Sequence, residues 1–305
     1  MKKRIVRTTK ESAQGVAKYG SVRQRRCWAM IVEALQEYIP TMEDIDWKNA
    51  NLELLRKYFP LNEKGELEVP VNAKYIVSGK RSVKPTLLKM KTVDVVDDID
   101  DKGALHTYPL FYDIIDHQNG KYSVGIAPRS LCWVLNLSKE MGYVSFCVES
   151  FVRLENAASM MVYLYISSNL KRVFEDGTRG KWVVKIKTIR GWLGCPQDYP
   201  NRKFIKEYLI AALGEFENRG TRLSFTFEVL RNSTENKMGR PGITSIIFEV
   251  TDHGSPRSTT GFEPVEDDNY YEEEDEMPVQ SEKDRWDEWD RIVEEERKKF
   301  ERHSA

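Results

Sequence analysis

Apolar residues recur at intervals of three and four along much of the chain, which is the pattern of helices that bury one face. The pattern predicts helices over residues 23–39, 47–58, 80–93, 129–137 and 157–174. The third of these is short and basic, and is interrupted near Pro85. Alternating apolar residues predict strands over 66–77, 122–126 and 143–148. We expect residues 1–20 to be a flexible basic segment and Asp94–Asp101 to be an acidic loop.

The order of the elements after residue 157 is the most informative part of the pattern. A short strand precedes a helix over 186–193, which Gly194 and Pro196 close. A longer helix follows over 200–218, with Pro200 in its first turn. The remaining segments are a strand, a polar loop and a strand, over 222–230, 231–242 and 243–250. This order predicts a winged helix, in which a helix-turn-helix is backed by a small sheet and the last hairpin forms the wing.

The helix over 200–218 would be the DNA recognition helix. Arg202, Lys203 and Lys206 lie outside its apolar stripe and in its first two turns, where recognition helices contact DNA. The other candidate DNA-binding residues lie before this helix, in the wing and in the first half of the chain: Lys185, Lys187 and Arg190; Arg231, Lys237 and Arg240; Arg81, Lys84 and Lys89. A solvated helix face and a polar hairpin without DNA contacts remain the alternatives for these charges.

The net charge of −1 conceals an asymmetry. The first 250 residues carry 39 Lys and Arg against 29 Asp and Glu, a charge of +10, whereas residues 251–305 carry 8 against 19, a charge of −11. A basic body with an acidic tail is common in proteins that bind nucleic acid, but acidic tails also serve solubility. We expect residues 253–282 to be disordered, and Trp286 and Trp289 to lie on a short helix over 283–300.

Several other classes of protein are disfavoured. The four cysteines are far apart, no apolar stretch is long enough for a membrane span, and the basic start lacks the apolar core of a secretory signal. No phosphate-binding G-x-x-x-x-G-K-[ST] motif is present, and none of the four histidines forms an H-x-H pair. The acidic run lacks the spacing of an EF-hand. We therefore expect a cytoplasmic protein that is not an enzyme and has no cofactor, metal or membrane partner.

The segment Ile189-Arg-Gly-Trp-Leu-Gly194 resembles the L-R-x-x-L-G helix of the iteron-binding plasmid replication initiators, which have tandem winged-helix domains. Tyr199-Pro200 before a basic helix, Gly239-Arg240 in the wing and Ile246-Ile-Phe248 on the closing strand also fit. The resemblance covers residues 105–250. The chain departs from the family at Ile205, where a basic residue is usual, and at Leu164, where an acidic one is.

The resemblance implies an α+β fold of two tandem winged-helix domains. We place the first over residues 21–153 and the second over 154–252, followed by the acidic tail over 253–305. It also implies a protein that binds repeated origin sequences, recruits host replication proteins and in some states forms a homodimer that represses its own gene. The alternatives are a winged-helix transcriptional regulator without an initiation role and an interaction protein that acts through the acidic tail.

Overall fold

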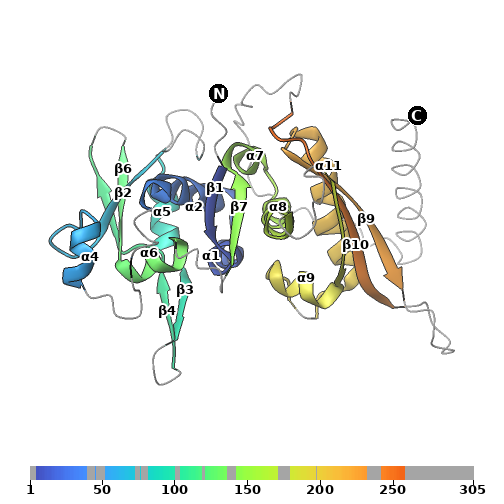
Figure 1. The fold of residues 1–305 in the computed structure, drawn as a ribbon, viewed down its shortest axis with the longest axis horizontal. Helices are drawn as coiled ribbons and strands as arrows, with labels where there is room; N and C mark the ends of the chain where they lie inside the picture. The colour runs from blue at the N-terminus through green and yellow to red at the C-terminus, as the bar shows by residue number, and fades with distance from the viewer. Residues whose placement is uncertain are drawn as a thin grey trace, which may run out of the picture. The chain divides into compact units, whose positions relative to one another are not determined.

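A computed structural model of the chain describes residues 5–39, 45, 52–72, 76, 82–99, 104–118, 121–135, 142–170, 179–196, 198–231 and 242–257. All of these belong to one compact unit, residues 1–265, with an α+β fold (Figure 1). The elements up to residue 153 are β1 (Ile5–Thr9), α1 (Lys10–Gly15), the 3₁₀ turn η1 (Val16–Lys18), α2 (Val22–Ala34), the 3₁₀ turn η2 (Leu35–Tyr38), α4 (Leu52–Tyr58), β2 (Leu67–Val71), α5 (Lys84–Lys91), β3 (Asp94–Ile99), β4 (Leu105–Pro109), β5 (Asp113–Asp116), β6 (Tyr122–Ile126), α6 (Pro128–Leu135), β7 (Tyr143–Cys147) and α7 (Val148–Arg153).

The second half follows the predicted order of elements. It consists of α8 (Ala157–Asn169), β8 (Arg179–Lys185), α9 (Ile186–Trp192), α10 (Asn201–Phe204), the π turn η5 (Ile205–Ile210), α11 (Ala211–Asn218), β9 (Leu223–Arg231) and β10 (Ile243–Asp252). The three strands form an antiparallel sheet in the order β8-β10-β9. Rings from α8 and α11 pack on one face of this sheet: Tyr165 contacts Phe248, and Phe216 contacts Phe225.

Helix α8 is buried on nearly every side, and this central position explains its sequence. Nine of its residues from Ser159 to Ser167 are buried, so the helix lacks the polar face of a surface helix. Asn156 caps its N-terminus by accepting a hydrogen bond from the Ala158 N–H at 2.7 Å. The core continues without a break into the first half, where Trp28 stacks on Phe146 at 5.5 Å. A domain boundary between residues 153 and 154 stays a prediction.

Two predictions for the first half were wrong because strand pairing overrides the local pattern. The supposedly flexible start forms β1, which pairs antiparallel with β7 about 140 positions later, and Val6, Ala13 and Val16 are buried. The supposed acidic loop forms β3, which pairs with β4 and buries Val95 and Val96. Strand β2 is shorter than predicted, and α7 was not predicted. Pro85 lies in the first turn of α5 and does not interrupt the helix, since the first N–H groups of a helix have no partner within it.

The described fold continues past Asp252, where we expected a disordered linker to begin. The N–H of Arg257 donates to the Gly220 carbonyl at 2.7 Å, and its guanidinium donates to the Phe216 carbonyl at 3.1 Å and pairs with Glu217 at 2.5 Å. Residues 253–257 therefore close over the C-terminal end of α11. The predictions for residues 258–305, including Trp286 and Trp289, lie outside the described residues.

An ion pair between Arg222 and Asp252 joins the residue before β9 to the last residue of β10. Nε and Nη2 of the Arg222 guanidinium donate to Oδ1 and Oδ2 of Asp252 at 2.6 and 2.5 Å. The Asp252 side chain is 12% exposed. Burial raises the pKa of Asp252, but the Arg222 and Gly254 hydrogen bonds outweigh it, so that the pKa lies below its usual value. The pair therefore stabilises the fold above the pKa of an unfolded aspartate, and this contribution is lost as the pH falls through the folded pKa.

Replacing Asp252 by Asn should lower the free energy of unfolding by about 2 kcal/mol at pH 7, because hydrogen bonds to charged groups contribute about 1.5–3 kcal/mol. Below about pH 4 the difference between the two proteins should shrink, since Asp252 is then protonated first in the unfolded chain and, at lower pH, in the folded protein. Denaturant unfolding at pH 7 and pH 3 measures both quantities, with the exposed Glu228→Gln as control. A difference that is the same at both pH values would contradict this role.

Candidate nucleic-acid interface

The helix formed by α10, η5 and α11 is held by one buried face. Phe204, Ile205, Leu209, Ala212 and Phe216 are all buried, and Phe204 stacks on Tyr208 at 5.1 Å. The Phe204 N–H donates to the Pro200 carbonyl at 2.9 Å, so the helix begins directly after the proline. A regular α-helix was predicted over residues 200–218. The structure departs from it at η5, where the backbone forms the wider π-helical turn. Such π turns are often found at functional sites.

The opposite face of this helix carries its basic residues. Lys203 and Lys206 are exposed, and Arg202 is half-buried, all within the first two turns. Lys185 and Lys187, at the end of β8 and the start of α9, are also exposed. The structure places Arg202, Lys203 and Lys206 outside the buried stripe of the helix, as predicted, whereas contact of any of these five residues with DNA stays a prediction.

Arg190 has a second role that the sequence did not indicate. Its guanidinium donates to the Pro196 carbonyl and, at 2.8 Å, to Asn201 Oδ1 at the first residue of α10. The turn itself closes where Gly194 adopts a φ of +69°, and the Cys195 N–H donates to the Arg190 carbonyl at 2.9 Å. Arg190 therefore fixes α10 relative to α9.

Tyr199, Lys203 and Glu207 form a polar cluster on the exposed face of the helix. The Tyr199 hydroxyl donates to Glu207 Oε2, and Lys203 Nζ lies 3.7 Å from Glu207 Oε1 and 5.1 Å from the centre of the Tyr199 ring. Desolvation, followed by the Glu207 hydrogen bond, raises the pKa of Tyr199, which keeps its hydroxyl protonated as a donor. The sequence analysis missed Glu207, although its position four residues after Lys203 is a signal for such a pair.

The other candidate residues are not brought together with this cluster by any described contact. Arg231 is exposed at the end of β9, and the wing residues Lys237 and Arg240 lie outside the described residues. Lys84 and Lys89 are exposed on α5, in the first half of the chain, and Lys84 Nζ pairs with Asp116 at 3.2 Å. Arg81 also lies outside the described residues.

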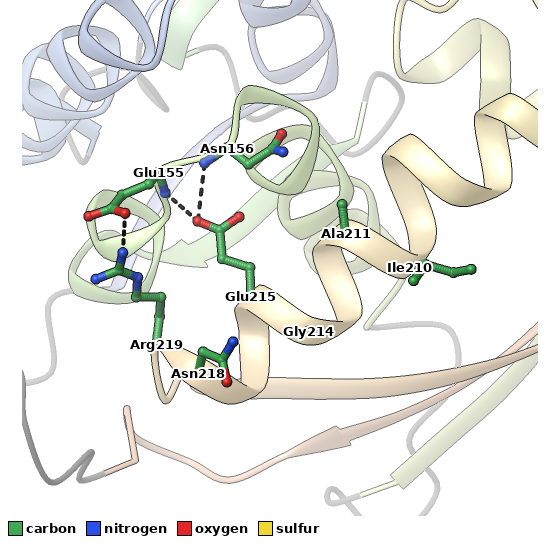
Figure 2. Close-up of a pocket in the computed structure, with 8 residues that line it drawn as sticks. All are labelled: Glu155, Asn156, Ile210, Ala211, Gly214, Glu215, Asn218 and Arg219. Atoms are coloured by element: carbon green, nitrogen blue, oxygen red, sulfur yellow. Dashed lines mark hydrogen bonds and ion pairs between the residues drawn. The ribbon is translucent and has the colours of Figure 1, made fainter. Parts of the chain in front are cut away.

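The C-terminal half of the same helix is anchored to the segment that precedes α8. A shallow pocket of about 620 Å³ lies here. In it, Glu215 Oε1 accepts hydrogen bonds from the N–H groups of Glu155 and Asn156, the latter at 3.1 Å (Figure 2). Arg219 pairs with Glu155 beside it. The same segment before α8 is also held by α2, because Arg26 of α2 donates to the Leu154 carbonyl at 3.0 Å. Burial lowers the pKa of Arg26. Glu155, Asn156, Glu215 and Arg219, which line this pocket, bond to one another and hold the helix against the segment before α8.

Within the described residues, no three His, Cys, Asp or Glu side chains lie together so that they could hold a metal ion. Cys27 and Cys195 are buried thiols, and burial raises the pKa of each. In the same part of the chain, no helix has both the length and the apolar character needed to cross a membrane.

Comparison with known proteins gives similarity of fold to solved structures. No family model matches the chain, and no curated protein matches it. Among solved structures, the chain is similar to one described as "Crystal structure of Pi initiator protein in complex with iteron DNA", with a TM-score of 0.49 and 15% sequence identity. The match covers 83% of this chain and 98% of the other.

Proposed function

We propose that the chain is a sequence-specific double-stranded DNA-binding protein that initiates plasmid replication. The observation that carries DNA binding is the helix over residues 201–218, whose buried face fixes it on the core while Lys203 and Lys206 project from its first two turns. A helix held in this way fits the major groove, where the basic side chains neutralise phosphates and contact base edges. The sheet β8-β10-β9 supports the assignment of this half as a winged helix whose wing is the segment between β9 and β10.

The first half supplies the second DNA-binding domain in this proposal. Lys84 and Lys89 are exposed on α5, which packs against α2. Two domains on one chain suit DNA with repeated sites, which is what the resemblance to the iteron-binding initiators implies for an origin of replication. Recruitment of host replication proteins, and a homodimer that represses the chain's own gene, belong to the same proposal.

Selection of bound fragments from a pool made from the source plasmid tests the proposal. We expect enrichment of a fragment with direct repeats, and loss of plasmid maintenance when the repeats are deleted. Enrichment of a promoter whose deletion leaves replication intact would instead favour the transcriptional regulator. If the full chain enriches no fragment, the interaction protein is favoured.

The dependence of binding on salt should show how many phosphates the protein contacts. Each neutralised phosphate contributes about −0.9 to the slope of log K against log salt, so we expect a slope steeper than about −4 for two domains on duplex DNA. Titrations with a labelled duplex between 50 and 200 mM salt would measure it. A slope shallower than about −2 would contradict binding by both domains.

A further inference from the structure

Glu207 is an acidic residue in the middle of the basic surface. It lies next to Lys206 in the sequence and pairs with Lys203, and its side chain is 46% exposed. It is absent from the buried face of the helix, so packing does not explain it. On a surface that meets phosphates a carboxylate opposes binding, since it repels the DNA backbone. Tyr199 donates to this carboxylate and Lys203 pairs with it within the chain, and a group on the DNA that donates to it would offset the repulsion.

The hydrogen bonds of Glu207 show which kind of partner would fit. Tyr199 donates to Oε2, while Lys203 lies 3.7 Å from Oε1, beyond hydrogen-bond distance. A carboxylate has about four acceptor positions and no donor, so several remain for a group outside the chain. Because the tyrosine bond fixes the direction of the carboxylate, these positions face solvent in a defined geometry beside Lys203.

In the major groove the matching group is an amino group at a base edge. Cytosine presents its N4 amino group there, whereas adenine presents its amino group next to the N7 acceptor, which repels a second carboxylate oxygen. We infer that Glu207 is a specificity-determining residue, which accepts a hydrogen bond from the N4 amino group of one cytosine in the DNA site. This inference rests on the proposed DNA-binding function and names the base that one residue of the helix selects.

Selection from a random duplex pool with the wild type, Glu207→Gln and Glu207→Ala tests the inference. The wild type should select cytosine at one position with a discrimination of about 5- to 150-fold over other bases. Glutamine still accepts the Tyr199 bond but pairs with adenine through N6 and N7, so E207Q should move the preference at that position to adenine. E207A should lose the preference at that position alone. Both variants should bind random duplex about two- to threefold more tightly at low salt, because one negative charge is removed.

Glu249→Gln is the matched control, since it removes an exposed carboxylate from β10 without altering the helix. It should leave the base preferences unchanged. If E207Q selects the same sequence as the wild type, Glu207 only braces Lys203 and Tyr199, and the inference is overturned. If the wild type selects no sequence at all, it is the proposed function that fails, so the two failures can be told apart.

Discussion

Replacing Arg202, Lys203 and Lys206 together by alanine should lower the affinity for the selected DNA site by at least about 100-fold, which corresponds to about 3 kcal/mol. A base-reading arginine contributes about 1–3 kcal/mol, and each phosphate contact that is lost makes the slope of log K against log salt less steep by about 0.9. The fold should survive, because none of the three residues is among the buried residues of the helix. Arg202 is half-buried, so a thermal unfolding curve is needed beside the binding titration.

The matched control for this variant is Arg56, Lys57 and Lys64 changed to alanine, which removes the same charge from the exposed surface at and after α4. Because the net charge falls equally in both, long-range attraction to DNA cancels in the comparison. The control should lose less than about tenfold in affinity. Equal losses in the two variants would show that only total charge matters, and would remove the helix over 201–218 from the interface.

The prediction of this helix from sequence succeeded because its determinants are local. Pro200 marks its start, and Phe204, Leu209 and Phe216 form a stripe that only a helix can bury on one side. The exposed position of Lys203 and Lys206 then follows from the phase of the helix. Local pattern was also sufficient for α9, which ends before Gly194 with its positive φ.

Elements that depend on distant partners could not be predicted in the same way. Ile5, Val6, Thr8 and Thr9 are β-branched and favour a strand, but so short a segment forms one only through its pairing with Tyr143–Cys147. The structural role of Arg190 depends on Asn201, which reaches it only through the turn. In sequence Arg190 looks like one more basic residue, and the structure alone shows which charges are used inside the fold.

Arg25 is the clearest case of a charge used inside the fold. It lies on α2, is buried, and donates to three backbone carbonyls: Tyr19 at 3.0 Å, Ala17 at 3.5 Å, and Ala157 at the first residue of α8. Burial lowers the pKa of Arg25 to about 10, so it is still protonated at pH 7. The planar guanidinium of Arg25 therefore holds the start of α8 against α2, close to the proposed boundary between residues 153 and 154.

Replacing Arg25 by Met should lower the free energy of unfolding by about 3 kcal/mol. Each buried carbonyl that loses its donor costs about 1–3 kcal/mol, and the apolar side chain offsets only part of this. Such a loss is large beside the 5–15 kcal/mol that stabilises a typical protein. If the two halves are separate domains joined here, the variant should unfold in two steps, with the first half losing hydrogen-exchange protection before the second.

Arg23→Met is the control for Arg25, since Arg23 is on the same helix and exposed, and it should change the stability by less than about 0.5 kcal/mol. Arg25→Lys should fall between the two, because an ammonium keeps the charge but cannot reach three carbonyls as a fork does. Denaturant unfolding followed by circular dichroism, with hydrogen exchange on the same samples, measures both the size and the order of the losses. If R25M unfolds in a single transition at a lower denaturant concentration than the wild type, α2 and α8 belong to one cooperative unit. The proposed domain boundary would then have to be abandoned.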